Sequence, residues 1–363
     1  MSGSSLLPQL RQPSLLVLVQ GVPLLGAIEA EVCSTNFLGA DRFVVRLALG
    51  LDYGFDAAFW SAATSVPVEV RIGTAGLASA VSLIQGAADL VEVDVLRGTV
   101  VIEGRDLTAR LIERRTQDIY ANRTASEIAT LLAQGAGLTP NVTATSTPVG
   151  RYYQGEHDRL TLDRYSRTTT DWDLLVFLAQ QEGFDVFVAG DGLFFQPPST
   201  SAPPVMVDVS MVQALRMEHA LPLAAGVSVT VKSWNSRQQS MVTATTGTTS
   251  PGAATDAGVR DYVSVRPNLT PDQAQAVAQI RLAELMSHER TITARMPGEL
   301  TITPRTLVQL SGTGTAFDQT YAVDEVTRRI GDGCGFVQTV RARAASGASL
   351  ALPSLLAGVA IYG

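Results

Sequence analysis

The residues whose types could support catalysis or metal binding gather in two short stretches. The first stretch holds Glu156, His157 and Asp158, with Asp163 close behind. A histidine between two carboxylates offers ligands for a metal ion and a general base. Adjacent residues point to different sides of a strand or loop, however, so these side chains do not converge on one ion. We interpret the cluster as a solvated loop.

The second stretch carries three carboxylates, Asp171, Asp173 and Glu182. Two carboxylates on either side of a glycosidic bond can act as acid and base. The first two follow Thr170, and the Thr170 to Asp173 spacing is that of a capping box, in which acidic residues stabilise a helix N-terminus. This stretch therefore predicts the start of a helix rather than an acid–base pair.

The remaining reactive side chains are scattered and favour ordinary structural roles. The chain has no phosphate-binding loop, no nucleophile elbow, and no second histidine after the "HERTI" that begins at His288. We predict no catalytic residue, no cofactor and no metal. The corresponding interpretations are packing or surface positions for His219 and His288, core positions for Trp172 and Trp234, and free thiols in a reducing compartment for Cys33 and Cys334.

Composition limits the partners of this chain. Its 363 residues carry 27 basic and 34 acidic side chains, a net charge of -7. Proteins that grip phosphate backbones are usually basic, so a DNA-gripping role is disfavoured. Lys232 is the sole lysine; the arginine excess suits planar contacts at interfaces, although a GC-rich genome gives the same bias. The length predicts two or three domains, and neither terminal apolar run fits a signal peptide or a membrane span.

The elements that must hold these residues are mostly strands. Alternating segments such as "SLLVLVQGVPLLGAIEAEVC", "DRFVVRLAL" and "VPVEVRIGT", followed by a long hairpin around Arg97 and Gly98, predict an antiparallel β-barrel over residues 1–110. Between them, "DYGFDAAFW" predicts a loop or a short helical turn.

Residues 111–203 change character and predict a small α/β insertion. A capping box at Thr124 and Glu127 begins one helix, and Thr170 begins a second that ends at Gly183. "FDVFVAGDGLFFQPP" then alternates on both sides of Gly190–Gly192, which is typical of a hairpin.

Strands resume over residues 204–345 and predict a second β-barrel. A helix over about 270–288 interrupts it, capped by Thr270 with Pro271 in the first helical position and Gln273 completing the box. Residues 346–363 form an apolar tail, which we expect to be buried in a contact with a neighbouring chain or a spike.

Four segments in this order carry a resemblance to a known family. "TASEIATLLAQGAGLTP", "TDWDLLVFLAQQEGFDVFVAGDGLFF", "VSVTVKSWNSRQQSMVTA" and "TYAVDEVTRRIGDGCGFVQTVRARA" resemble successive signatures of the phage late control D family, the baseplate hub proteins of tailed phages. The N-terminal part of type VI secretion spike proteins is similar. The resemblance covers roughly residues 12–345.

The resemblance implies a structural late protein of the virion that is assembled in the host cytoplasm. Three copies, a homotrimer, would form a pseudo-sixfold ring with the tail tube protein on one face and the spike on the other. The insertion would contact neighbouring chains, the spike or other baseplate proteins. DNA would be ejected through the channel without specific binding, past an acidic wall. The chain ends at Gly363 without a β-helical segment, so the spike is expected to be a separate chain.

Two alternatives stay open. One is another tail component with related barrels, a distal tail or tube-initiating protein, which would assemble as six copies. The other is a tail-associated cell-wall hydrolase, which would need a cleft with a perturbed carboxylate.

Overall fold

Strands dominate the structure and confirm the expected mainly β class. The computed structural model describes residues 13–73, 80–115, 118, 120–146, 149, 151–152, 160–162, 170–198, 202–235, 240–249, 260–266, 269–331, 333 and 335–345. Glu156, His157, Asp158, Asp163, Cys334 and the tail 346–363 lie outside these residues. None of the described helices is long and apolar enough to cross a membrane.

The first β unit is a curved antiparallel sheet built by residues 14–106. Its alternating apolar residues point to one shared core that includes Val17, Phe43, Val70 and Ile102. Its elements are β1 (Ser14–Val19), β2 (Val22–Leu24), β3 (Ala27–Thr35), β4 (Arg42–Ala48), α1 (Ala57–Ala62), β5 (Pro67–Gly73), β6 (Val81–Asp94) and β7 (Thr99–Asp106).

The α/β insertion, residues 108–196, has a core of its own. The capping boxes at Thr124 and Thr170 are both present, and Gly183 ends its helix in the left-handed conformation, as predicted. The turn at Gly190 and Asp191 joins the expected hairpin. The elements are α2 (Thr108–Glu113), β8 (Tyr120–Ala121), α3 (Ala125–Gly135), β9 (Thr139–Val142), β10 (Arg151–Tyr152), β11 (Leu160–Leu162), α4 (Asp171–Glu182), β12 (Asp185–Ala189) and β13 (Gly192–Gln196).

The second β unit packs around a third core that includes Ile302, Tyr321, Val323 and Val340. It consists of β14 (Val205–Asp208), a 3-10 turn (Val209–Met211), β15 (Ala214–His219), β19 (Arg290–Pro297), β20 (Leu307–Ser311), β21 (Thr320–Gly331) and β22 (Gly335–Ala344).

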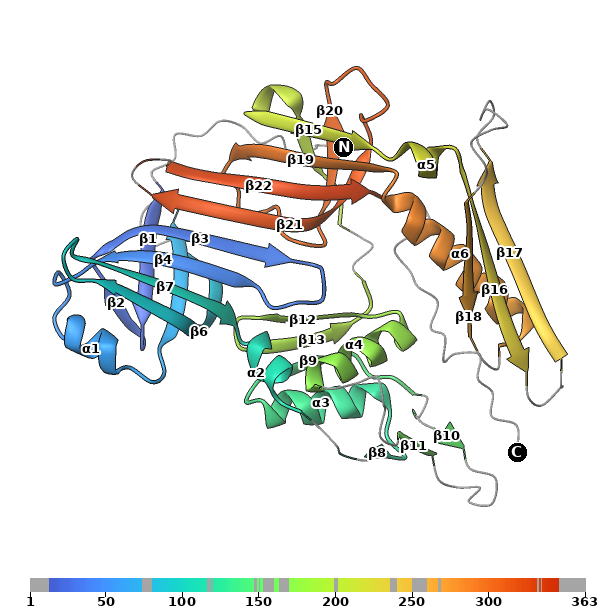
Figure 1. The fold of residues 1–363 in the computed structure, drawn as a ribbon, viewed down its shortest axis with the longest axis horizontal. Coiled ribbons are helices and arrows are strands. Elements are labelled where there is room, and N and C mark those ends of the chain that lie inside the picture. Colours follow the sequence, from blue (N-terminus) through green and yellow to red (C-terminus); the bar gives the residue numbers. More distant parts are fainter. Residues whose placement is uncertain are drawn as a thin grey trace.

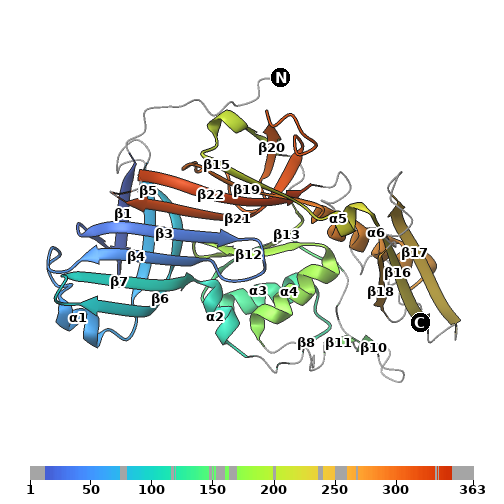
Figure 2. The same cartoon turned by 45° about the horizontal axis from the view of Figure 1, so that its top comes forward.

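A side unit stands apart from the large sheet. It lies between β15 and β19 in sequence and comprises α5 (Leu221–Ala224), β16 (Gly226–Asn235), β17 (Ser240–Thr249), β18 (Arg260–Val265) and α6 (Pro271–Ser287). The capping box at Thr270 is confirmed. Helix α6 covers one face of the three-stranded sheet β17-β16-β18, and a fourth core lies between them. Figures 1 and 2 show this unit at the far end of the molecule.

The two β units are joined edge to edge into one 13-stranded sheet. Strand β21 pairs antiparallel with β3 from Glu325↔Thr35 to Gly331↔Glu29, and Figure 1 shows the two strands side by side at the boundary of the units. Neither unit closes into a barrel through strand pairing within the described residues. The predicted barrels and the domain limits at 110, 203 and 345 therefore stay predictions.

The two units repeat one strand pattern. Apart from β2, which pairs with β1 and has no counterpart among the described strands of the second unit, pairing runs β3-β4-β7-β6-β5-β1 in the first unit and β15-β19-β22-β21-β20-β14 in the second, with each strand at the same place in the chain order. One difference is that β1 pairs antiparallel with β5, whereas β14 pairs parallel with β20. The chain is thus an internal duplication in which the α/β insertion connects the two repeats.

Two local expectations were wrong. The hairpin expected from the sequence "LVEVDVLRGTVVIEGRDLTARLI" around Gly98 does not continue to the end of that segment at residue 112, because β7 ends at Asp106 and α2 begins at Thr108. Trp234 is not a core residue and is 55% exposed. Since side chains alternate along β16, Val227, Val229 and Val231 face α6 and Trp234 faces the other side.

Glycines let the backbones of β6 and β7 approach closely. A Cβ added at Gly104 would overlap the backbone carbonyl of Ala87, which lies in the β6–β7 ladder, and the ring of Phe43, which is buried in the core. We predict that Gly104→Ala lowers the free energy of unfolding by about 1–3 kcal/mol, the usual cost of overpacking. Urea denaturation measures this, and Gly39→Ala, where an added Cβ meets nothing within 4 Å, is the control. Equal stability of the two variants would contradict the packing argument.

Candidate functional site

The sequence candidates do not converge. Asp173 serves in the capping box of α4, as predicted, whereas Asp171 is fully buried and lies 3.2 Å from Nε of Arg114. His219 lies 3.3 Å from Glu289, and His288 caps the end of α6 beside Arg343. Among the described residues, no group of three or more histidine, cysteine, aspartate or glutamate side chains is placed to hold a metal ion.

Cys33 is a free thiol on β3. Burial raises the pKa of this thiol, against a hydrogen bond with Thr327 on β21. A raised pKa leaves less of the reactive thiolate at neutral pH. This position thus supports a structural role for Cys33.

Trp172 ties the insertion to the first β unit. Its side chain is buried, as predicted, and its indole N–H donates to the carbonyl oxygen of Leu38 at 2.8 Å. Leu38 lies in the loop between β3 and β4, so the hydrogen bond crosses from α4 to the first β unit. The sequence pattern indicated burial of Trp172 but gave no sign of this partner.

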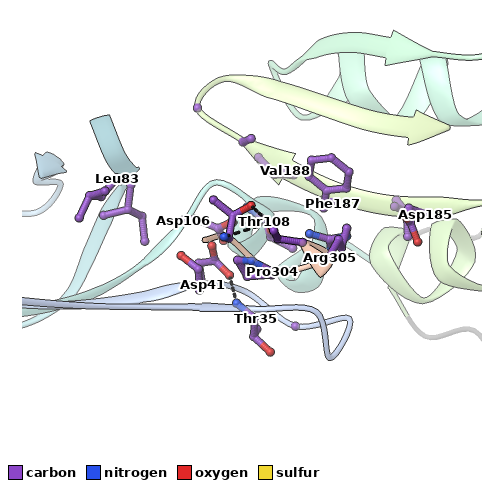
Figure 3. Close-up of a pocket in the computed structure, with 18 of the residues that line it drawn as sticks. Thr35, Asp41, Leu83, Asp106, Thr108, Asp185, Phe187, Val188, Pro304 and Arg305 are labelled. Atoms are coloured by element: carbon purple, nitrogen blue, oxygen red, sulfur yellow. Dashed lines mark hydrogen bonds between the residues drawn. The ribbon is translucent and has the colours of Figure 1, made fainter. Parts of the chain in front are cut away.

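A cavity of about 570 Å³ lies where the insertion and both β units meet. The first β unit contributes Asp41 and Asp106, the insertion contributes Asp185, and the second β unit contributes Arg305 and Arg328. Figure 3 shows Arg305 between Asp185 on one side and the Asp41 and Asp106 pair on the other. This buried ionic junction, defined by these five residues, is the strongest concentration of perturbed charges among the described residues.

Two of its carboxylates are held by neighbouring groups (Figure 3). Asp41 accepts a hydrogen bond from the Thr35 amide at 2.8 Å. Asp106 accepts from the hydroxyl of Thr108 at 2.9 Å and from its amide at 3.2 Å. Thr108 is also the first residue of α2. The hydrogen bonds between Thr108 and Asp106, at the junction of β7 and α2, therefore also hold the Asp106 carboxylate in place.

Burial dominates the electrostatics of these carboxylates. It raises the pKa of Asp106 to about 7, and the nearby charge of Asp41 adds to the rise. The pKa values of Asp41 and Asp185 are also raised, mainly by burial, and nearby arginines oppose the shift. The junction therefore favours partly protonated carboxyl groups.

The arginines are similarly constrained. Burial lowers the pKa of Arg328 to about 10, and its guanidinium donates to the carbonyl oxygens of Glu299 and Ile302. Burial also lowers the pKa of Arg305, which the charges of Asp185 and Asp41 oppose. Arg305 lies 4.1 Å above the ring of Phe187 and has a positive φ of 74°. A strained backbone and a cation–π contact together fix this side chain against the insertion.

A second charged feature occurs once in each β unit. Asp89 interrupts the pairing of β6 with β7 as a β-bulge and lies 2.6 Å from Arg105. Asp324 interrupts the pairing of β21 with β22 in the same way and lies 3.2 Å from Arg343. Asp324 is buried beside the β3 end, where the Asn36 amide donates to its carbonyl oxygen, whereas Asp89 is exposed. The repeated ion pair supports the duplication seen in the strand order.

Similar folds occur among phage tail proteins. The 43 kDa tail protein of prophage MuSo2 from Shewanella oneidensis is 16% identical, with a TM-score of 0.69 over 94% of this chain and 99% of that one. A tail protein from Neisseria meningitidis MC58 gives the same values. The Escherichia coli c3393 protein, a component of the type VI secretion system, is 11% identical, with a TM-score of 0.55 over 94% of this chain and 80% of that one.

These likenesses show that the chain has the fold of phage tail proteins and of a component of the type VI secretion system. At the level of the fold, they confirm the resemblance to baseplate hub proteins that the sequence indicated. Residues 88–332 match the family model described as the Alg8 N-terminal domain, which is more than half of the chain. The chain therefore belongs to this family. No curated protein matches the chain. The expectation that it is not an enzyme stays a prediction.

The raised pKa of Asp106 makes stability depend on pH. The unfolded carboxyl ionises near pH 4 and the folded one near 7. The folded state thus holds more protons between these values, and the contribution of Asp106 to stability falls as pH rises from 4 to 7, by up to about 4 kcal/mol. Asp106→Asn should remove this dependence on pH. The free energy of unfolding of the variant, relative to that of wild type, should therefore be higher at pH 8 than at pH 4.5. Urea midpoints across this range measure it, with Asp94→Asn, at a partly exposed carboxylate, as control. Parallel curves for Asp106→Asn and wild type would refute the assignment.

The junction also predicts a coupling between Arg305 and Asp185. Arg305→Met leaves buried carboxylates without their cation, at a cost of about 3 kcal/mol. In an Asp185→Asn background the same change should cost about 1–2 kcal/mol less. Backbone strain at residue 305 is common to all variants and cancels in the cycle. Four urea denaturation curves test this, and a coupling of zero would show that Arg305 acts through Phe187 alone.

Proposed function

We propose that this chain is the structural baseplate hub of a phage or phage-like tail. Three copies form a ring with six similar β units, between the sixfold tail tube and the threefold spike. The matched structures described as tail proteins support a structural tail role. The observation that carries the ring is the way in which the duplicated units are joined.

Inside the chain, the two β units are joined through strands that are not equivalent, β21 of the second unit and β3 of the first. Strand β21 of the second unit uses one side for β22 and the other for β20 and then β3. Its equivalent in the first unit, β6, pairs with β7 on one side and with β5 up to Ala87 on the other. The Ala88 amide still donates to the Val66 carbonyl oxygen on that second side, and residues Asp89–Asp94 of β6 keep it open within the described part of the chain.

The matching edge is also open. Strand β15, the equivalent of β3, pairs with β19 alone among the described strands. The pairing of β3 with β21 can thus be repeated between copies, by β15 of one chain and residues 89–94 of β6 in the next. Unlike edges that pair repeatedly give a heterologous contact, which closes into a ring when the rotation permits. Three chains provide three joins within chains and three between them.

An inter-copy strand would also cover Asp89. Inside the chain, Asp324 at the equivalent bulge is buried beside the end of β3, while Asp89 is exposed. Open strand edges are a hazard for uncontrolled association, so their pairing in a closed ring removes that hazard.

The face of the large sheet that points away from the cores lines the channel in this proposal. It carries charges of both signs, and Arg329 on β21 pairs with Glu29 on β3 across the join. The exposed arginines on this face include Arg42, Arg46, Arg295 and Arg341. This wall is therefore mixed in charge rather than acidic.

One rim of the first β unit supports an axial partner. Leu25, Leu51, Tyr53 and Leu96 are exposed on three loops at the same end of the strands. The carboxylate of Asp52 joins two of these loops by accepting hydrogen bonds from the amides of Leu25 at 2.7 Å and Gly26 at 3.0 Å. Exposed apolar clusters mark interaction surfaces, and we propose that the neighbouring ring of the tail contacts this rim.

The ring contact can be tested with a matched pair of methionines. Met217 on β15 is 38% exposed and Met206 on β14 is 39% exposed. Met217→Glu should weaken ring formation at least about tenfold by placing a charge at the inter-copy edge, which corresponds to about 1.4 kcal/mol, whereas Met206→Glu should not. Mass photometry across a dilution series, with circular dichroism to confirm folding, measures the effect.

Negative-stain imaging of the wild-type rings decides the stoichiometry. Threefold rings of six similar lobes support the hub. Rings of six copies would indicate a distal tail or tube-initiating protein, and peptidoglycan degradation by the purified chain would indicate the hydrolase alternative.

A further inference from the structure

The side unit leaves one face of its sheet uncovered. Helix α6 packs on the face formed by Val227, Val229, Val231 and Ala244. The opposite face carries Trp234 on β16, Met241 on β17, and Val263 and Val265 on β18. Their exposed fractions are 55%, 65%, 58% and 75%. These four residues are called the open patch below.

Strand register makes the open patch continuous. Trp234 lies directly opposite Met241, and Val265 lies opposite Lys232, whose neighbour on the same face of β16 is Trp234. Side chains directly opposite or diagonal on one face are within contact distance. Large apolar side chains grouped in this way, rather than scattered singly, indicate a binding surface.

We propose that the apolar segment 346–363 docks on the open patch of the same chain, in place of the contact with a neighbouring chain or a spike that the sequence alone suggested. Its sequence, "SGASLALPSLLAGVAIYG", contains no aspartate, glutamate, lysine or arginine. It therefore buries apolar surface against the patch without bringing a charged side chain of its own into the contact.

The chain enters this segment at a suitable place. Nη1 of Arg343, near the end of β22, lies 3.4 Å from Nε2 of His288 at the end of α6. At the start of the same helix, the Leu269 amide donates to Ser233, the neighbour of Trp234, at 2.8 Å. The distance from residue 345 to the open patch is thus set mainly by the length of α6.

The reach of the segment is ample. Helix α6 has 17 residues, a length of about 25 Å. An extended segment of 18 residues spans up to about 60 Å, which leaves enough chain to pass the edge of the sheet and cover the patch. The same chain can therefore supply the occupant, without requiring ring formation.

Photo-crosslinking of the full chain tests the contact. Benzoylphenylalanine is introduced in place of Met241, and equal amounts of ¹⁴N- and ¹⁵N-labelled chains are mixed and irradiated. We expect crosslinks to peptides from 346–363 in which both parts carry the same label. The same probe in place of Met206 on β14 is the control. Crosslinks with mixed labels would assign the segment to a neighbouring copy, and the lack of crosslinks to 346–363 would equally overturn the proposal.

A second measurement uses substitutions on the surface alone. Trp234→Ser with Val265→Ser should raise the rate of chymotrypsin cleavage within 346–363 severalfold, because the docking surface is lost, while circular dichroism stays unchanged. Leu96→Ser, at a side chain that is 99% exposed on the rim of the first β unit, should leave that rate unchanged. Equal cleavage rates in wild type and the double variant would refute the docking.

Discussion

The pairing of β3 with β21 is the constraint on which the rest of the structure depends. It joins strands that are about 290 residues apart in sequence and turns two curved sheets into one. A shift of register by one residue would exchange the core-facing and outward-facing side chains of both strands. Val32 and Val326 must face inward while Glu29 and Arg329 pair on the outer face, so the alternation of both strands fixes how the units meet.

The buried ionic junction adds specificity to this arrangement rather than a large net stability. Desolvation opposes every charge in it, as the raised pKa values of the carboxylates and the lowered pKa values of the arginines show. Such groups favour one arrangement mainly because any other leaves a buried charge without a partner. Arg305 illustrates this: its guanidinium lies over the ring of Phe187 in the insertion, and the charges of Asp185 and Asp41 stabilise it there.

Local sequence signals predicted the helices well. The capping boxes at Thr124, Thr170 and Thr270 all occur because each involves residues three apart in the chain. The fusion of the sheets was not predictable in this way, since edge pairing between distant strands leaves no periodic signal of its own. The prediction that Trp234 lies in the core was wrong for a related reason. Alternation assigns its side chain to one face of the sheet, but the sequence does not say which of the two faces a helix covers.

Two β-barrels per chain were expected, but the equivalence of individual strands in the two β units was not visible in the sequence, although one signal was present. Asp89 with Arg105 and Asp324 with Arg343 occupy the same bulge in each unit. Each β unit therefore has a hairpin with an aspartate in its first strand and an arginine in its second. This shared pattern allows the two halves of the sequence to be aligned.

The order of synthesis gives the late position of β21 a further consequence. The first β unit leaves the ribosome with the β3 edge uncovered, and the strand that covers it follows only after the insertion, the side unit and most of the second β unit. Contacts between residues so distant in sequence form slowly, and an uncovered edge is prone to pairing with other chains in the meantime. The β3 edge is therefore covered only when the hairpin of β21 and β22 has been synthesised. From then on, the chain exposes only the strand edges that remain open in the folded protein.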